Sequence, residues 1–173
     1  MKILVFDDTK LHRDVAKVQL TGHDLTIVGT YDEAEAALTS SEFDVVLTDL
    51  MVPPSEKWYQ SHGREYDATP MPLGSIIALL ALSKGTKKVG VVTETSHHSH
   101  PASMAIEHLA TTNTGFKVLA DTNPCQWFDP ATLEIVSLDF VYGTPAGKEK
   151  YPNKTKDLFL AKDWSKALES LLS

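Results

Sequence analysis

The chain opens with an apolar run that two acidic residues close, Ile3-Leu4-Val5-Phe6-Asp7-Asp8. Four consecutive apolar residues are typical of a strand that is buried on both faces, as in a parallel sheet. After the two aspartates, Leu11, Val15 and Val18 recur at helical spacing until Gly22. The N-terminal region therefore predicts a strand, an acidic loop and a helix.

The same alternation continues along the chain. We expect further strands at residues 25–28, 43–47, 89–92 and 158–161, and helices at residues 31–38, 74–84 and from 164 to the C-terminus. Thr30 and Glu33 have the spacing of a capping box, and Asp163 is a predicted N-cap. The helix at 74–84 is apolar on nearly every side, which predicts deep burial or a cover by an insertion. This order of elements predicts an α/β fold with a parallel sheet.

Two stretches interrupt the alternation, at about residues 54–73 and 111–156. Both contain prolines, glycines and aromatic residues, so we interpret them as insertions in a single domain that spans residues 1–173. The second contains two extended runs, 116–120 and 133–138, separated by turn signals. These runs predict an extra hairpin at the edge of the sheet.

Composition narrows the classes of partner and location. Of the 173 residues, 16 are Lys or Arg and 23 are Asp or Glu, and the net charge of −7 argues against a nucleic acid or an anionic membrane as partner. Cys125 is the only cysteine, which indicates a reducing compartment and predicts a cytoplasmic location. No apolar run approaches the roughly 20 residues of a membrane-spanning helix.

Polar residues stand at the ends of the predicted strands: Asp7 and Asp8, Asp49, Thr93, and Lys162. Ligands of open parallel sheets bind outside the carboxyl ends of the strands, so these side chains are expected to meet. Three carboxylates repel one another unless a cation lies among them, and oxygen ligands of this kind suit Mg²⁺. A hydroxyl and an ammonium group could contact phosphoryl oxygens. The set is therefore suited to phosphoryl transfer onto a carboxylate.

The sequence resembles the receiver domain of two-component response regulators over roughly residues 1–53, 74–110 and 157–173. The resemblance is carried by Ile3-Leu4-Val5-Phe6-Asp7-Asp8, Asp49-Leu50-Met51-Val52-Pro53, Val91-Val92-Thr93 and Leu158-Phe159-Leu160-Ala161-Lys162. It implies a flavodoxin-like three-layer sandwich with five parallel strands in the order 2-1-3-4-5. It also implies site roles: Asp7, Asp8 and Asp49 as Mg²⁺ ligands, Asp49 as phosphoacceptor, Thr93 and Lys162 as phosphoryl contacts, and Phe159 as the aromatic switch residue.

The function implied is that of a stand-alone receiver. A histidine kinase or phosphotransfer protein would donate the phosphoryl group, self-hydrolysis would remove it slowly, and a downstream protein would read the change. Such a protein is not a conventional metabolic enzyme. Glu94 and Asp163, which follow Thr93 and Lys162, depart from the small residue and the proline usual in the family. These departures and the insertions favour an alternative, a pseudo-receiver that is not phosphorylated and binds partners through its insertions.

The sequence leaves the identity of the fifth strand open. We favour residues 158–161, because a helix with a clean apolar face follows them, as the family pattern requires. The rival is 116–120, which would place Asp121 or Asn123 where the lysine should stand. We interpret His97, His98 and His100 as a solvated loop, and His12 and Arg13 as solvated side chains. The insertion aromatics Trp58, Tyr59, Tyr66, Trp127 and Phe128 would either hold the insertions on the domain or bind a partner.

Overall fold

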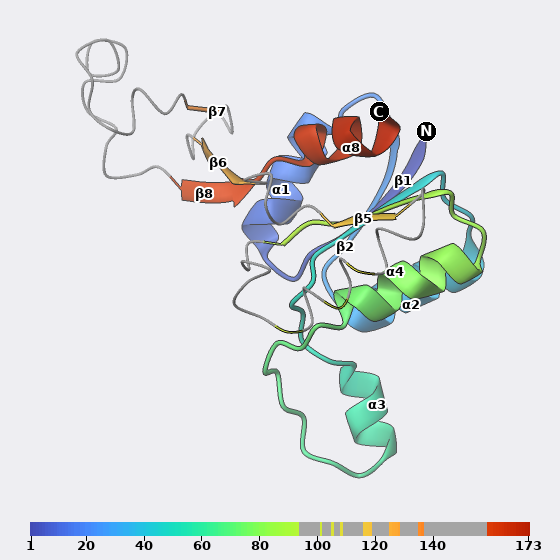
Figure 1. The fold of residues 1–173 in the computed structure, drawn as a ribbon. Helices are drawn as coiled ribbons and strands as arrows, with labels where there is room; N and C mark the ends of the chain where they lie inside the picture. The colour runs from blue at the N-terminus through green and yellow to red at the C-terminus, as the bar shows by residue number, and fades with distance from the viewer. Residues whose placement is uncertain are drawn as a thin grey trace.

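The computed structural model describes residues 1–93 and 159–173 and, between them, residues 101, 105, 108, 116–118, 125–128 and 135–136. The elements, drawn in Figure 1, are β1 (Lys2–Phe6), α1 (Lys10–Gln19), β2 (Asp24–Val28), α2 (Tyr31–Ser40), β3 (Val45–Thr48), α3 (Glu56–Ser61), α4 (Gly74–Ser83), β4 (Lys88–Val91), β5 (Phe116–Val118), β6 (Cys125–Phe128), β7 (Ile135–Val136), β8 (Phe159–Lys162) and α8 (Trp164–Leu172). Most bounds agree with the predicted ones to within two residues. The predicted capping box of Thr30 and Glu33 is present at the start of α2.

The central sheet has the strand order β2-β1-β3-β4-β5, and every neighbouring pair in it is parallel. In register, Val5 lies opposite Ile27 on one side and Leu47 on the other. The order confirms the predicted α/β, flavodoxin-like arrangement of five parallel strands. Because β1 and β3 are neighbours, the residues that follow them lie at the same edge of the sheet.

The identity of the fifth strand differs from the favoured prediction. β5, which pairs with β4, belongs to the rival run 116–120, so the assignment of residues 158–161 to the central sheet is wrong. The later run forms β8 instead, which pairs antiparallel with β6 in a separate sheet of order β7-β6-β8. Both runs are short and apolar, and such a run can add to an exposed strand edge wherever one is offered. A helix that follows a strand does not reveal the strand's neighbours.

An extra hairpin does form within the second insertion. Its strands are β6 and β7, which pair antiparallel with Trp127 opposite Val136. The predicted hairpin joined residues 116–120 to residues 133–138. In the structure residues 116–118 pair with the central sheet, and β6 takes their place beside β7. The hairpin pairs with β8, through β6, and not with the edge of the central sheet.

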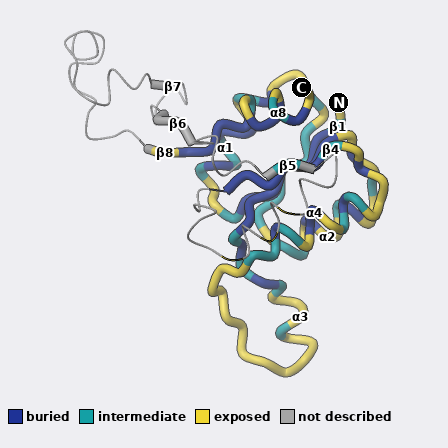
Figure 2. Tube along the Cα trace, viewed as in Figure 1, coloured by how far each residue is buried: buried dark blue, intermediate teal, exposed yellow. Residues whose placement is uncertain are grey.

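Helices cover both faces of the central sheet (Figures 1 and 2), and an apolar core lies on each face. Alternate residues of the strands supply them, since successive side chains point to opposite faces. Ile3 and Val5 pack with α1 and α8, whereas Leu4 and Phe6 pack with α2 and α4. The result is the predicted three-layer sandwich.

Burial of α4 is one-sided, contrary to the sequence prediction. Ile77, Ala78 and Ala81 are buried against the sheet, but Ile76 and Leu79 are each 45% exposed. The first insertion does not cover them and carries α3, whose residues are largely exposed (Figure 2). In the part of the chain that the structure describes, no helix has the length and apolar character needed to cross a membrane.

The start of α4 packs directly on the backbone that follows β3. A Cβ atom added at Gly74 would lie 1.6 Å from the carbonyl oxygen of Asp49 and 2.9 Å from Cα of Leu50. The Gly74 amide donates to the Leu50 carbonyl at 3.0 Å. Only glycine permits this approach, and the approach fixes the backbone that carries Asp49.

We predict that Gly74→Ala lowers the free energy of unfolding by about 3 kcal/mol or more, because the new methyl group meets backbone atoms. Urea unfolding measures the change. Gly29→Ala is the matched control, since its Cβ would meet the flexible Arg13 guanidinium at 2.9 Å. We expect a loss below about 1 kcal/mol for the control. Equal stability of the Gly74 variant and the wild type would contradict the close approach.

Candidate functional site

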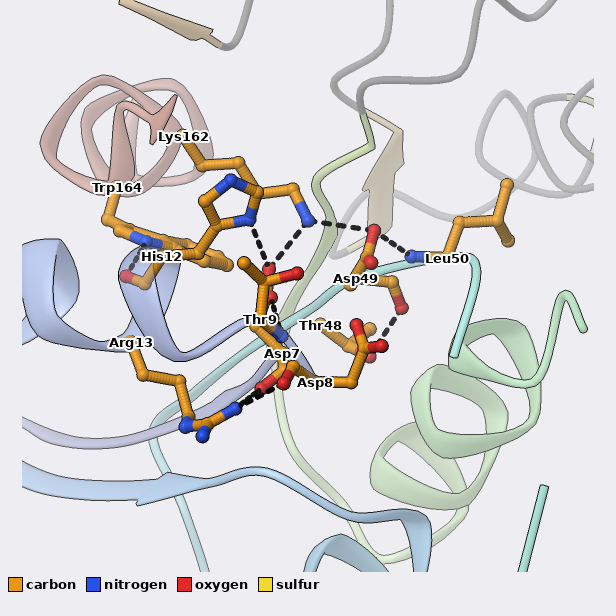
Figure 3. A network of polar contacts seen from close by, with 10 residues as sticks. All are labelled: Asp7, Asp8, Thr9, His12, Arg13, Thr48, Asp49, Leu50, Lys162 and Trp164. Carbon is orange, nitrogen blue, oxygen red and sulfur yellow. Dashed lines mark hydrogen bonds and ion pairs between the residues drawn. The ribbon is translucent and has the colours of Figure 1, made fainter. Parts of the chain in front are cut away.

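Four of the predicted site residues, Asp7, Asp8, Asp49 and Lys162, meet at the carboxyl edge of the central sheet (Figure 3). Asp7 and Asp8 follow β1, Asp49 follows β3 and Thr93 follows β4. Asp7, Asp49 and Thr93 are buried, while Asp8 is half-buried. Carboxylate oxygens of the three aspartates lie within 4.8 Å of one another. The predicted acidic cluster is therefore present.

Lys162, the last residue of β8, places its ammonium group between two of these carboxylates. Its Nζ lies 2.6 Å from Oδ2 of Asp7 and 2.8 Å from Oδ1 of Asp49. The side chain is 1% exposed. The position of the lysine and the place of residues 158–161 in the central sheet belong to one sequence-based prediction. The two are independent, because Lys162 reaches the site from a strand outside the central sheet.

Both oxygens of the Asp7 carboxylate accept hydrogen bonds. Oδ1 accepts from the Thr9 amide at 2.9 Å, and Oδ2 accepts from Lys162 and lies 3.1 Å from Nδ1 of His12. Burial alone would raise the pKa of Asp7, but the His12 hydrogen bond and the Lys162 charge outweigh it and hold the pKa below its ordinary value. Asp7 therefore stays ionised.

The pKa values of Asp49 and Asp8 shift upward, opposite to that of Asp7. Burial raises the pKa of Asp49 to about 6, although the charge of Lys162 opposes the rise. Burial and the nearby charge of Asp7 also raise the pKa of Asp8. Lys162 itself loses solvation, which lowers its pKa, but Asp49 and Asp7 outweigh this and leave its pKa raised. The site thus holds more negative charge than its one lysine balances.

Two residues of α1 contact the site but are not among the predicted site residues. His12 was predicted to be solvated, but it is buried and contacts Asp7. Arg13, also predicted to be solvated, is half-buried, and its Nη1 donates to the carbonyl oxygens of Asp7 and Asp8 at 2.7 Å each. The buried face of α1 consists of His12, Val15 and Ala16, whereas Val18 is 49% exposed. His12 lies three and four residues before Val15 and Ala16, a spacing that places all three on one face of a helix. This spacing was the sequence signal for the burial of His12.

A cavity of about 250 Å³ opens beside the carboxylates and is lined by Asp8, Thr9, His12, Asp49, Met51, Pro70, Thr93 and Lys162. Mg²⁺ prefers carboxylate oxygens in octahedral geometry and keeps several waters, for which such a cavity has room. The raised pKa values of Asp49 and Asp8 indicate that a cation would be favoured there. Asp7, Asp8 and Asp49 therefore fit a Mg²⁺ site.

Several predicted features lie outside the described residues. These are Glu94, His97, His98, His100, Asp121 and Asn123. Phe159 is the first residue of β8 and pairs with Phe128, but its side chain is not among those described. Its switch role stays a prediction.

No protein-family model and no curated protein matches the chain. Among solved structures it is similar to the response regulator TrrA from Thermotoga maritima in complex with Mg²⁺-BeF, with 20% identity over 70% of this chain and 89% of that chain and a TM-score of 0.43. It is also similar to a CheY-like receiver domain protein from Methanospirillum hungatei (16% identity; 69% and 78% covered; TM-score 0.47) and to the BeF3-activated DrrB receiver domain (18%; 76% and 89%; 0.46). All three TM-scores are below 0.5. The fold is therefore assigned from the strand order and register of this chain and not from these similarities.

We predict that Mg²⁺ raises the free energy of unfolding of the wild type by about 1–3 kcal/mol at 10 to 100 times its dissociation constant. Asp8→Asn should lose most of this gain, because Asp8 belongs to the acidic cluster. Thermal unfolding with and without Mg²⁺ measures the effect. Asp14→Asn, an aspartate that pairs with Lys10 and Lys17 on α1, is the control. A gain of the same size in all three proteins would argue against the site.

We predict that Asp49→Asn stabilises the metal-free protein at pH 7 by up to about 3 kcal/mol. The Asp49 pKa rises from 3.8 to about 6 on folding, so the folded protein keeps a proton that the unfolded chain loses between these values. Wild-type stability should therefore fall, relative to the variant, as pH rises from 4 to 6 and then level off. Urea unfolding across this range is the measurement. A stability difference that does not change with pH would count against the raised pKa.

Proposed function

We propose that the chain is a response regulator receiver that accepts a phosphoryl group on Asp49. One observation carries the proposal: the buried Lys162 ammonium bridges Asp7 and Asp49 where Asp8 completes a cluster of three carboxylates. A structural ion pair alone needs one carboxylate for each lysine. The surplus of acids beside a cavity supports a site for a cation and a phosphoryl group.

Asp49 has the properties required of the nucleophile. In the part of the chain that the structure describes, Oδ1 of Asp49 accepts from the Leu50 amide at 2.7 Å and lies 2.8 Å from Nζ of Lys162. Oδ2 is therefore the oxygen for attack. With a pKa of about 6 the carboxyl group is ionised at neutral pH, yet more basic than an ordinary aspartate, which favours nucleophilic attack.

The transfer balances as an in-line displacement at phosphorus. The bond from Asp49 Oδ2 to phosphorus forms while the bond from phosphorus to the donor's imidazole nitrogen breaks, and that nitrogen keeps the electron pair. Mg²⁺ held by Asp7, Asp8 and Asp49 would neutralise phosphoryl charge. Lys162 would contact one phosphoryl oxygen as its hold on Asp49 loosens, and Thr93 would donate to another. Water would later attack phosphorus, the bond from phosphorus to Asp49 Oδ2 would break, and inorganic phosphate would leave with the oxygen of the water while Asp49 returns to a carboxylate.

The partners in this proposal are proteins. A histidine kinase or phosphotransfer protein supplies the phosphoryl group in the cytoplasm. The added negative charge at Asp49 shifts an existing equilibrium between two conformations, and a downstream protein binds one of them. Phe159 would follow this shift as the switch residue.

Exposed aromatic side chains on the first insertion favour a second candidate, the pseudo-receiver. Trp58 and Tyr66 are 46% and 38% exposed, and a partner protein could bury them. In that case the acidic cluster would bind a metal ion or serve structure only. The two candidates differ in whether Asp49 carries a phosphoryl group.

We predict that the protein gains one phosphoryl adduct when it is incubated with Mg²⁺ and acetyl phosphate, measured by intact mass. Asp49→Ala should abolish the adduct because it removes the nucleophile. Lys162→Ala should slow its formation by about 10²-fold or more, the scale on which charge stabilisation at a transition state acts. Chelation of Mg²⁺ should prevent the adduct.

Asp44→Ala is the matched control, since Asp44 is an exposed aspartate that accepts from the Lys2 amide, far along β3 from the site. It should form the adduct at the wild-type rate. Absence of any adduct on the folded wild-type protein would reject the receiver and leave the pseudo-receiver. An adduct that survives in Asp49→Ala would show that another residue is the acceptor.

A further inference from the structure

A second set of contacts connects the residues after Lys162 to the end of α1. Gln19, the last residue of α1, makes three of them. Its Oε1 accepts from the Trp164 amide at 2.7 Å, its Nε2 donates to Oδ1 of Asp163 at 3.4 Å, and its carbonyl accepts from the Ser165 hydroxyl at 3.2 Å. We call Gln19, Asp163, Trp164 and Ser165 the latch.

Trp164 anchors the latch in the core. The side chain is fully buried, and its Nε1 donates to the carbonyl oxygen of His12 at 2.9 Å. The Lys162 ammonium lies 5.8 Å from the centroid of the Trp164 ring. His12 in turn contacts Asp7 through its side chain. His12 therefore contacts both Asp7, which is a carboxylate partner of Lys162, and Trp164, which lies two residues after Lys162.

Asp163 has two roles in this arrangement. Its Oδ1 accepts from the Lys166 amide at 3.0 Å, which caps α8, and the same oxygen accepts from Gln19. The residue is buried, so its carboxylate depends on these donors. Asp163, which stands where the family usually has a proline, thus supplies a contact to α1.

The central sheet does not set the position of Lys162. Strand β8 pairs with β6, and no pairing joins it to β4 or β5 among the described strands. A lysine side chain has several rotatable bonds, and burying its charge is costly unless the partners are held in place. The Lys162 backbone is held by its pairing with Cys125, by the packing of the preceding Ala161 in the core with α1, and by the contacts of the residues directly after it.

We propose that Gln19 is a positioning residue, which holds Lys162 between Asp7 and Asp49 through its contacts with Asp163 and Trp164. The inference rests on the proposed function in so far as Lys162 assists phosphoryl transfer. The placement of Lys162 itself can be tested without any transfer.

The test replaces one polar atom of the latch and then restores the pairing. Gln19→Glu keeps an acceptor for the Trp164 amide but sets a carboxylate against Asp163. Adding Asp163→Asn supplies a donor to that carboxylate again and keeps a good N-cap. Reductive methylation followed by mass spectrometry reports how accessible each lysine is. Lys10, whose side chain is 81% exposed, is the internal reference.

We expect Lys162 to be methylated about tenfold faster in Gln19→Glu than in the wild type, the change that the loss of one or two net hydrogen bonds supplies. The double variant should return to the wild-type rate. Adduct formation with acetyl phosphate and Mg²⁺ should fall and recover in parallel. Gln60→Glu, which sets a carboxylate beside Glu56 on the exposed helix α3, is the matched control and should change neither readout.

The outcomes separate this inference from the proposed function. If Lys162 stays protected in Gln19→Glu, or if the double variant does not restore its protection, the positioning role is overturned even when the wild type forms an adduct. If the methylation pattern is as expected but the wild type forms no adduct, Gln19 does position Lys162 and phosphoryl acceptance is what fails.

Discussion

The site depends on a buried lysine that neutralises carboxylates from two neighbouring strands. Lys162 is 155 residues from Asp7 in the sequence, yet the two are in contact with almost no exposure to solvent. Removing Lys162 would leave the buried charge of Asp7 without its ammonium partner, a loss that typically costs about 3–5 kcal/mol. Four parts of the chain must therefore meet at this point: the end of β1, the end of β3, the first turns of α1 and the start of α8.

The two carboxylates beside the lysine have different environments. Asp7 also contacts His12 and the Thr9 amide, so its pKa is lowered and it remains a permanent negative charge. Burial dominates at Asp49 and raises its pKa to about 6. Neighbouring titratable groups whose pKa values are pushed apart are typical of sites in which one group is structural and the other reacts. The raised pKa fits the role of nucleophile that we propose for Asp49.

The sequence predicted the acidic edge of the sheet because the rule behind it is local: parallel neighbours end at the same side, so the residues after β1 and β3 must meet. It also predicted the capping box of Thr30 and Glu33, which depends on four consecutive residues. The fifth strand could not be predicted, since the pairing of a short apolar run is decided by partners distant in the chain. His12 was missed for a related reason: its spacing from Val15 and Ala16 indicates burial, but only the position of α1 over the sheet shows that its side chain reaches Asp7.

The separation of Lys162 from the central sheet has a consequence for the second insertion. In a sheet that ended in the lysine's own strand, the register of that strand would fix the lysine. Here β5 occupies the place beside β4, and the lysine is held by the pairing of β8 with β6 and by the contacts of the following residues with α1. The entropic cost of closing a loop grows only slowly with its length, so residues can be added before β8 at little cost in stability. Residues added between β6 and β8 leave in place the contacts of Asp163 and Trp164 with α1, because these two residues come after Lys162.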